Sequence, residues 1–419
     1  MQVFHPFLMF LLCFLLVFSV TGQALAEIDS PVRIAFLTDL HYIAPSLTDY
    51  GPAFMQVITR ADGKVTRYCD EIAETFIDQV RGLNVSAVVL QGDLTFNGAI
   101  ESHTALASKL SALRQAGIPV YVIPGNHDVY NRNAARFSGS GYARVSSATS
   151  GDFAKIWSDF GYSQALSRDP ASLSYTVDLS PQVRLLMIDV NTKGKIGVLR
   201  EETLYWAELQ LMQAQEEQRV VLAVSHQNLL LHNALFSTGF RMEGAAKLEE
   251  LYRKYGVICN ISGHMHAQHI AGTNTGLPEI AVSSATVSPC QFGLLTLYKN
   301  ELEYHTRLIP VDRWAAAQGS TNQELLSFPR YARDFFNAGM NRQKPVPDTE
   351  KHAQIINDYA ARLNAAYFAG NLTDFSAKDP IYRLICSSLT TTSLYLKSIE
   401  PDLGRNYTTL HYTFGGSQK

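Results

Sequence analysis

Short apolar runs alternate with amphipathic segments from Pro31 to about Pro310. The runs are rich in β-branched residues and predict buried strands; in chain order they are VRIAFL, VSAVVL, IPVYVI, VRLLMIDV, RVVLAVS and GVICNIS. Between them, apolar residues recur at helical spacing, in the sets Val65, Cys69, Ile72, Phe76 and Val80, then Leu106, Leu110 and Leu113, then Leu248, Leu251 and Tyr255. Strands that alternate with helices predict βαβ units and an α/β fold with a largely parallel sheet.

Two segments in this part of the chain depart from the alternation. GLLTLY and ELEYHTRLI flank Lys299-Asn300, so they predict an antiparallel hairpin that closes the domain. The stretch RFSGSGYARVSSATSGD is rich in glycine and serine and predicts a long loop. Long ordered loops often carry function.

Helical periodicity replaces the strand pattern after Pro310. One face of a predicted helix carries four apolar residues: Ile355, Tyr359, Leu363 and Tyr367. Gly370-Asn371 would end that helix. We therefore predict a helical C-terminal region over 313–419, whose apolar faces are more typical of packing than of a partner site.

The N-terminus carries an apolar run, Phe7–Val20, that is short for a bilayer span of about 20 residues. Ala24-Leu25-Ala26 follows it and has the small-x-small pattern of a signal-peptidase site. We therefore predict a signal peptide over 1–26 and an exported protein, either secreted, periplasmic or at the cell surface. The segment before the apolar run has no Lys or Arg, so a retained anchor is the alternative, and only then would we expect membrane contact.

Composition limits the possible partners and the redox chemistry. The chain of 419 residues is 46% hydrophobic with a formal net charge of −3, so it can bury a large core and has no nucleic-acid footprint. The oligomeric state stays open. Export would leave four cysteines in an oxidising compartment: Cys69, Cys259, Cys290 and Cys386. No C-x-x-C spacing indicates a zinc site, and both disulfides and buried free thiols remain open.

Polar residues of metal-binding types follow five of the predicted strands. They are Asp39 and His41 after IAFLT, Asp93 after AVVLQ, Asn126, His127 and Asp128 after VYVIP, His226 after VVLAVS, and His264 and His266 after VICNIS. In open α/β sheets, sites form where loops leave the carboxyl ends of the strands. We therefore expect these side chains to converge at one rim.

The chemistry of the cluster indicates divalent metals. Carboxylates, imidazoles and an amide suit Zn, Mn, Fe or Co. Seven candidate ligands are too many for one ion: Asp39, His41, Asp93, Asn126, His226, His264 and His266. A carboxylate shared between two ions resolves the count, and two ions about 3.5–4 Å apart would clamp a phosphoryl oxygen and lower the pKa of a bridging water.

The ordered set D-x-H, G-D, G-N-H-D, H and G-H-x-H resembles the calcineurin-like metallophosphoesterase superfamily over about Pro31 to Pro310. The resemblance implies an α/β four-layer αββα sandwich over 27–312. It also implies two divalent ions (Mn, Fe, Zn or Co), one held by Asp39, His41 and His266, the other by Asn126, His226 and His264, with Asp93 bridging. His127 would be the general acid beside the leaving group, and Asp128 would orient its ring.

The stretch from GDLT to GNHD resembles the cyclic-nucleotide-phosphodiesterase-like branch, and FGYSQALSRDPASLSY resembles exported bacterial members of that branch. Phe96 stands where purple acid phosphatases carry a tyrosine ligand, which argues against a tyrosinate-iron centre. The resemblance implies hydrolysis of a small-molecule phosphate ester by a metal-bridging hydroxide, with a phosphodiester as the leading substrate. A broad phosphomonoesterase is the alternative, and a non-catalytic exported binding protein is the rival class.

Other residues near the motifs carry less support. Tyr42, Asn97 and Arg132 flank the motifs and are candidates to line the substrate pocket. The remaining histidines of the folded part are interpreted as structural or surface residues: His103, His232, His269, His305, His352 and His411.

Overall fold

The structure, a computed structural model, describes residues 27–61, 63–342, 344–347, 349, 351–388 and 390–415. The expected signal peptide over 1–26 lies outside these residues, so cleavage and export stay predictions. Among the described residues, none of the helices combines the length and the apolar character that a bilayer crossing needs.

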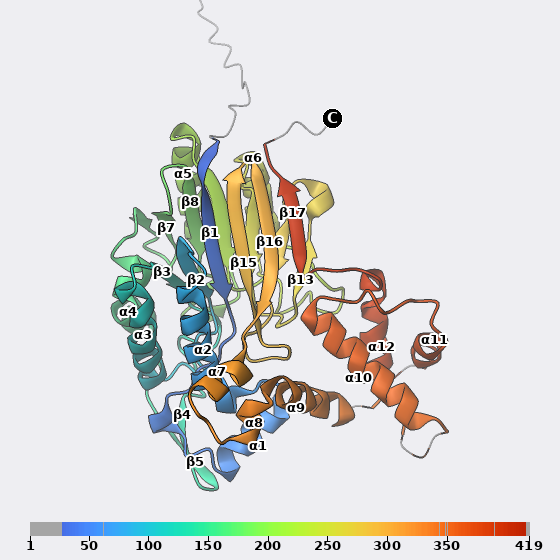
Figure 1. Ribbon diagram of the computed structural model, residues 1–419. Helices are drawn as coiled ribbons and strands as arrows, with labels where there is room; N and C mark the ends of the chain where they lie inside the picture. The colour runs from blue at the N-terminus through green and yellow to red at the C-terminus, as the bar shows by residue number, and fades with distance from the viewer. Residues whose placement is uncertain are drawn as a thin grey trace, which may run out of the picture.

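Two large sheets form the centre of the molecule (Figure 1). The first has the strand order β17-β16-β15-β1-β2-β3 and the second β13-β14-β12-β11-β8-β7-β6. The first sheet contains β1 (Ile28–Leu37), β2 (Ala87–Gln91), β3 (Val120–Ile123), β15 (Gln291–Lys299), β16 (Glu301–Leu308) and β17 (Thr409–Thr413). The second contains β6 (Ser167–Arg168), β7 (Tyr175–Asp178), β8 (Val183–Ile188), β11 (Val220–Ser225), β12 (Cys259–Ser262), β13 (His269–Ala271) and β14 (Glu279–Ala281).

Each sheet combines parallel and antiparallel strands, with the parallel strands on one side of the first sheet and in the middle of the second. β1, β2 and β3 are parallel, as are β8, β11, β12 and β14. β15 and β16 are antiparallel and pair through Tyr298 and Glu301 around the turn, which confirms the hairpin predicted at Lys299-Asn300. The carboxyl ends of the parallel strands therefore meet at one edge of each sheet.

Helices lie on the outer faces of both sheets but leave β15, β16 and β17 uncovered toward the viewer in Figure 1, and further helices extend beyond the sheets. They are α1 (Pro52–Arg60), α2 (Cys69–Arg81), α3 (Ile100–Gln115), α4 (Ser150–Ile156), α5 (Glu201–Glu216), α6 (Ala245–Lys254), α7 (Val311–Ala317), α8 (Gln323–Leu326), α9 (Phe328–Arg342), α10 (Ala353–Ala369), α11 (Pro380–Cys386) and α12 (Thr391–Ser398). α2 and α3 pack on the first sheet, and α5 and α6 pack on the second.

Successive side chains of β8 point alternately into the core between the two sheets and toward the helices that cover the second sheet. Leu185 and Met187 belong to the core between the sheets, whereas Leu186 and Ile188 pack with α5 and α6. A strand that is buried on both faces is mostly apolar; the one charged residue of VRLLMI, Arg184, is buried in ion pairs with Asp178 and Glu217. The expected four-layer αββα sandwich is confirmed.

The segment predicted as a long loop is instead largely ordered secondary structure. It contains the hairpin of β4 (Ala135–Ser138) and β5 (Gly141–Arg144) and the start of α4. Thr149 and Asp152 form a capping box at that helix start. Glycine and serine therefore supply the turn between two short strands, with Gly139 at a φ of 55°. A second small ribbon pairs β9 (Asn191–Thr192) with β10 (Lys195–Ile196).

The C-terminal region is helical, as predicted, with two corrections. β17 returns to the first sheet and pairs antiparallel with β16, so the strand pattern does not end at Pro310. On α10, Tyr359, Leu363 and Tyr367 are buried as expected, but Ile355 is 56% exposed and its neighbour Ile356 takes the buried position. Gly370 ends the helix in the left-handed conformation, as predicted.

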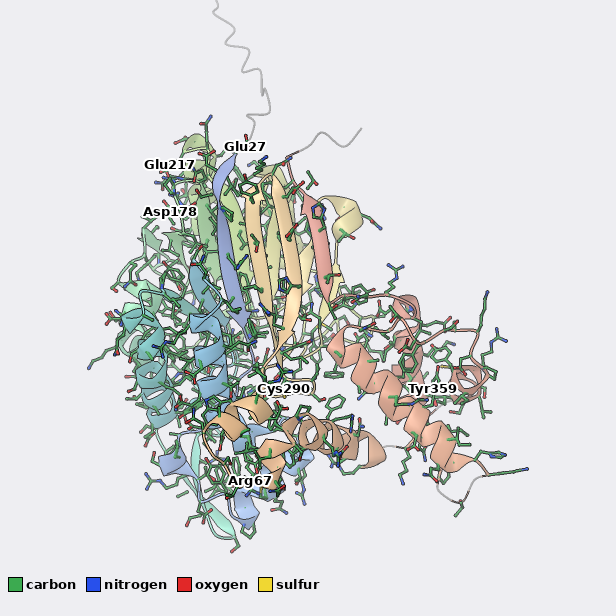
Figure 2. The ribbon with its side chains drawn as sticks, viewed as in Figure 1. Glu27, Arg67, Asp178, Glu217, Cys290 and Tyr359 are labelled. Atoms are coloured by element: carbon green, nitrogen blue, oxygen red, sulfur yellow. The ribbon has the colours of Figure 1, made fainter. Side chains whose placement is uncertain are left out.

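The four cysteines of the described chain are free thiols. Cys69, Cys259 and Cys290 are buried, and Cys290 directly precedes β15 at the lower end of the first sheet (Figure 2). Burial raises the pKa of the Cys69 thiol to about 12. These thiols therefore pack as small hydrophobic groups.

A buried polar network joins the C-terminal region to the second sheet. The Nδ1 atoms of His232 and His269 lie 3.0 Å apart. The Nε2 atom of His232 is 3.1 Å from a carboxylate oxygen of Glu279, and that of His269 is 3.1 Å from Asp402. Tyr407 also donates a hydrogen bond to Asp402, at 2.7 Å. His232 and His269 are therefore structural residues that lie outside the candidate metal cluster, as predicted.

We expect Asp402→Asn to lower the free energy of unfolding by about 1–3 kcal/mol, because hydrogen bonds to a buried charged group contribute about this much. Urea unfolding of the purified chain measures the change. The matched control is Asp374→Asn, which alters an exposed carboxylate of the same region and should leave stability unchanged. Equal stability of the two variants would show that the network does not hold the C-terminal region in place.

Candidate metal centre

The predicted site residues converge at the rim shared by the two sheets. Each follows the carboxyl end of a strand: Asp39 and His41 follow β1, Asp93 follows β2, Asn126 follows β3, His226 follows β11, and His264 and His266 follow β12. Acidic and histidine ligand atoms form two groups, each with all its atoms within 4.8 Å of one another. Asp93 belongs to both groups.

The first group gathers around Asp39. Its Oδ1 atom lies 3.2 Å from Nε2 of His266 and 3.8 Å from Nε2 of His41. The two Nε2 atoms lie 3.3 Å from each other. Oδ2 of Asp93 is 3.9 Å from Nε2 of His41. Asp39, His41 and Asp93 are buried. Four ligand atoms therefore face a common point.

The second group gathers on the other side of Asp93. Its Oδ2 atom lies 3.4 Å from Nε2 of His226, and His264 completes the group. Oδ1 of Asn126 lies 3.1 Å from the same nitrogen of His226. The structure therefore brings together all seven side chains that the sequence predicted as ligands.

The environment of Asp39 fits a bound cation. Its Oδ2 atom accepts hydrogen bonds from Thr38 Oγ1 at 2.7 Å and from the backbone N–H of His264 at 2.9 Å. Its Oδ1 atom is buried and makes no hydrogen bond. A buried carboxylate oxygen without a partner costs free energy, and a divalent ion between Oδ1 and the histidine nitrogens would offset that cost.

Backbone carbonyls fix the orientation of two candidate histidine ligands. Nδ1 of His226 lies 2.8 Å from the carbonyl oxygen of Gln91, so this nitrogen carries the proton and Nε2 is left for a metal. His264 is turned the other way, because its Nε2 lies 2.8 Å from the carbonyl of Gly239, which leaves Nδ1. Such outer hydrogen bonds set the tautomer of metal-binding histidines.

The backbone is strained where the candidate ligands lie. Five of them adopt a positive φ: Asp39 at 52°, His41 at 47°, Asp93 at 48°, His264 at 66° and His266 at 60°. Only a few per cent of non-glycine residues do so, and such strain persists where the surrounding structure enforces it, often at functional sites. Gly125 is needed for a related reason, since a Cβ there would lie 2.3 Å from Oδ1 of Asp93.

Burial and the neighbouring charges shift the pKa values of His226 and His264 in opposite directions. Burial alone would lower the pKa of His226, but the adjacent carboxylate of Asp93 outweighs it and raises that pKa to about 9. Burial, with the charge of His226, lowers the pKa of His264 to about 4. An ion that binds His226 must therefore displace its proton.

His127 lies beside the two groups and belongs to neither. Its Nδ1 atom lies 2.8 Å from the carbonyl oxygen of Phe96, and its Nε2 atom lies 3.9 Å from Oδ2 of Asp93. Its backbone N–H donates to Oδ1 of Asp93 at 2.8 Å. One side of the imidazole is thus anchored and the other faces the cluster.

The predicted role of Asp128 is wrong, because its carboxylate does not hold the ring of His127. Instead it accepts hydrogen bonds from the backbone N–H groups of Leu94, Thr95 and Gly125, at 3.0, 2.8 and 2.8 Å. It is fully buried. Asp128 therefore ties the loop after β2 to the loop after β3, and the carbonyl of Phe96 orients the ring of His127.

The three flanking candidates differ in position. Arg132 and Asn97 each line a cavity that borders His127. Tyr42 does not, because its hydroxyl donates to Asp70 at 2.7 Å and lines a different hollow.

Four further residues, which the sequence did not indicate, lie at the site: Lys64, Phe236, Phe240 and Phe368. With Asp93, these residues line a cavity of about 420 Å³ over the cluster. Phe368 comes from α10, so the C-terminal region forms part of this wall. None of the four belongs to a ligand motif, so no sequence signal pointed to them.

Comparisons with known proteins agree with this geometry. The family model for calcineurin-like phosphoesterase matches residues 32–268, and the model for the C-terminal domain of cyclic nucleotide phosphodiesterase matches residues 310–405. A probable glycerophosphodiester phosphodiesterase of Arcobacter nitrofigilis is 25% identical over 239 residues, which are 56% of this chain and 75% of that protein. A probable cyclic nucleotide phosphodiesterase of Vesicomyosocius okutanii is 37% identical over 62 residues, 15% of this chain and 25% of that protein.

Solved structures also align with this chain. A dimetal phosphatase from Danio rerio aligns with a TM-score of 0.48 at 15% identity, over 66% of this chain and 96% of that one. A purple acid phosphatase from yellow lupin aligns with a TM-score of 0.44 at 17% identity, over 67% and 52%. Because the first family model covers more than half of the chain and the second covers most of its C-terminal region, the chain belongs to the calcineurin-like phosphoesterase family, in its cyclic-nucleotide-phosphodiesterase-like branch, and is a metal-dependent hydrolase of phosphate esters.

Proposed function

We propose that this chain binds two divalent ions and hydrolyses small phosphodiesters, cyclic nucleotides or related diesters. The observation that carries the proposal is the place of Asp93, whose carboxylate belongs to both groups of ligand atoms. Its Oδ2 atom lies within 4 Å of a histidine nitrogen of each group, so this carboxylate could contact two cations at once. A single-ion site would need no such shared ligand.

The two groups suggest how the ligands divide. Asp39, His41 and His266 would hold one ion, Asn126, His226 and His264 the other, and Asp93 would contact both. Imidazole together with carboxylate suits Mn, Fe, Zn or Co.

Bound ions would polarise a phosphoryl oxygen and lower the pKa of a water held between them. The side chain of His127 would supply the proton that the leaving group needs. Because Nδ1 of His127 is held by the carbonyl of Phe96, a proton that the ring transfers would leave from Nε2, which faces the cluster. As the P–O bond to the leaving group breaks, Nε2 would give this proton to the departing oxygen.

Two observations favour a diester over a monoester. Both curated relatives are named as phosphodiesterases. A diester also carries a second organic group, which the phenylalanine-lined cavity over the cluster can accommodate. A broad phosphomonoesterase is the alternative.

Metal content and a substrate panel test the proposal together. After reconstitution with Mn or Zn, elemental analysis should find two ions per chain. Cyclic nucleotides and bis-p-nitrophenyl phosphate should be hydrolysed with a higher kcat/KM than p-nitrophenyl phosphate. One ion per chain at saturation would contradict the two-ion site, and a preference for p-nitrophenyl phosphate would favour the monoesterase.

A further inference from the structure

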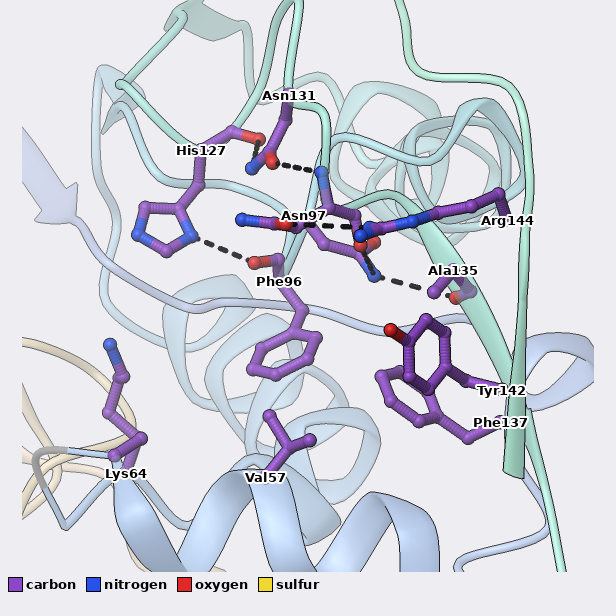
Figure 3. A pocket seen from close by; sticks show the side chains of 12 residues that line it. Val57, Lys64, Phe96, Asn97, His127, Asn131, Ala135, Phe137, Tyr142 and Arg144 are labelled. Carbon is purple, nitrogen blue, oxygen red and sulfur yellow. Dashed lines mark hydrogen bonds between the residues drawn. The ribbon is translucent and has the colours of Figure 1, made fainter. Parts of the chain in front are cut away.

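A second cavity, of about 380 Å³, opens beside His127 (Figure 3). Three aromatic side chains line it, from Phe96, Phe137 and Tyr142, and two cations, from Lys64 and Arg144. None of the described residues that line it is acidic. The cavity therefore combines aromatic rings with positive charge and with the amides of Asn97, Asn131 and Asn133, which suits a ring-bearing substrate that carries negative charge.

The hairpin β4–β5 builds one wall of this cavity. Phe137 and Tyr142 are paired across the two strands, with ring centroids 6.3 Å apart. Phe137 is only 6% exposed and packs against Phe54 of α1, at 5.6 Å between centroids. The hairpin is therefore anchored to the body of the protein, and its aromatic wall is preformed.

Tyr142 is held in place although it is 62% exposed. The guanidinium of Arg144 lies 5.4 Å from the centre of its ring, and Nη1 of Arg144 also donates to Oδ1 of Asn133, at 3.4 Å. A cation over an aromatic face restrains the ring without covering it from the cavity. An aromatic ring that is positioned but uncovered can stack on a ligand at little cost in side-chain entropy.

This cavity is continuous with the candidate metal centre. Lys64 and His127 line both this cavity and the one over the cluster. Figure 3 shows Lys64 on the side of the cavity away from Tyr142, with its ammonium end directed toward His127. A phosphoryl group at the cluster would thus lie next to His127, and the group beyond His127 would enter this cavity.

We propose that Phe96, Phe137, Tyr142 and Arg144 form a leaving-group pocket that takes a flat, apolar ring. The proposal rests on the proposed function, because it places the leaving oxygen beside Nε2 of His127. A ring can stack against the uncovered face of Tyr142, while Asn97, Asn131 and Asn133, which also line the cavity, can hydrogen-bond polar atoms at its edge. A small group without a ring would leave that aromatic face uncovered. The pocket therefore selects esters of ring-bearing alcohols over esters of glycerol-like ones.

Calorimetric titration of two phosphonates into the metal-loaded full chain tests the pocket. Phenylphosphonate should bind at least about 10-fold more tightly than methylphosphonate, since it buries a ring. Tyr142→Ala should weaken phenylphosphonate binding by about 3- to 10-fold, the range expected for an aromatic pair, and leave methylphosphonate binding unchanged. Tyr142 is exposed, so the variant should fold. Tyr205→Ala removes a tyrosine of α5 that is 66% exposed and should change neither affinity.

The outcomes separate the pocket from the proposed function. Equal affinity for the two phosphonates, or an unchanged ratio in Tyr142→Ala, would overturn the pocket even if diesters are hydrolysed. Selective binding of phenylphosphonate that depends on Tyr142 would support the pocket even if the preferred ester proves to be a monoester. Equal losses in Tyr142→Ala and Tyr205→Ala would show a general effect of surface tyrosines and overturn the assignment.

Discussion

Asp93→Asn should release both metal ions and lower activity by more than about 100-fold. Oδ2 of Asp93 lies 3.4 Å from Nε2 of His226 and 3.9 Å from that of His41, so one carboxylate serves both groups. An amide is neutral and offers a single oxygen, so it cannot balance two cations. Changes one step further from a metal already cost about 10–100-fold in affinity or activity, and loss of a shared ligand should cost more.

We choose asparagine because it removes the negative charge of Asp93 but can keep the hydrogen bond that holds the loop after β3 in position. Its side-chain oxygen can still accept the hydrogen bond from the backbone N–H of His127, which Oδ1 of Asp93 accepts at 2.8 Å. Asp402→Asn is the control, since it neutralises a buried carboxylate that contacts a histidine outside the cluster. Elemental analysis after dialysis should find both ions in the control and none in Asp93→Asn. Loss of one ion alone would assign Asp93 to a single site.

The sandwich could be predicted because its strands are buried on both faces. VRLLMI and VVLAVS contain almost no polar residue, and such runs fit only a covered sheet. Convergence of the ligands followed from the same reasoning, since parallel strands share one carboxyl edge. Strand order therefore predicted the convergence of seven candidate ligands that are up to 227 residues apart, from Asp39 to His266.

Features that depend on tertiary contacts could not be predicted. β4 and β5 form a hairpin because Phe137 packs against Phe54, and a glycine-rich stretch gives no sign of such a partner. β17 pairs with β16, about a hundred residues earlier in the chain, and only the folded chain brings them together. Ile355 and Ile356 are adjacent and equally apolar, so packing alone decides which one is buried.

Asp128 shows why adjacency in a motif is a weak guide to contact. In a tight loop, side chains of neighbouring residues point in different directions, and a buried carboxylate turns toward the backbone N–H groups that would otherwise lack partners. The loops after β2 and β3 supply three such groups. The ring of His127 is instead held by the backbone carbonyl of Phe96, a contact that does not depend on the side chain at that position and so leaves no sequence signal.

His127→Ala should keep both ions yet lower kcat by about 10²–10⁴-fold on esters with poor leaving groups, the usual range for general acid catalysis. The imidazole belongs to neither ligand group, so its removal should leave the metal content unchanged. Because p-nitrophenolate departs without a proton, the loss should be much smaller on bis-p-nitrophenyl phosphate than on an alkyl ester. His411→Ala, which removes an exposed histidine of β17, should change neither rate. Elemental analysis together with kcat on the two leaving groups decides the matter: if the variant loses an ion, or slows equally on both esters, then His127 is not the acid.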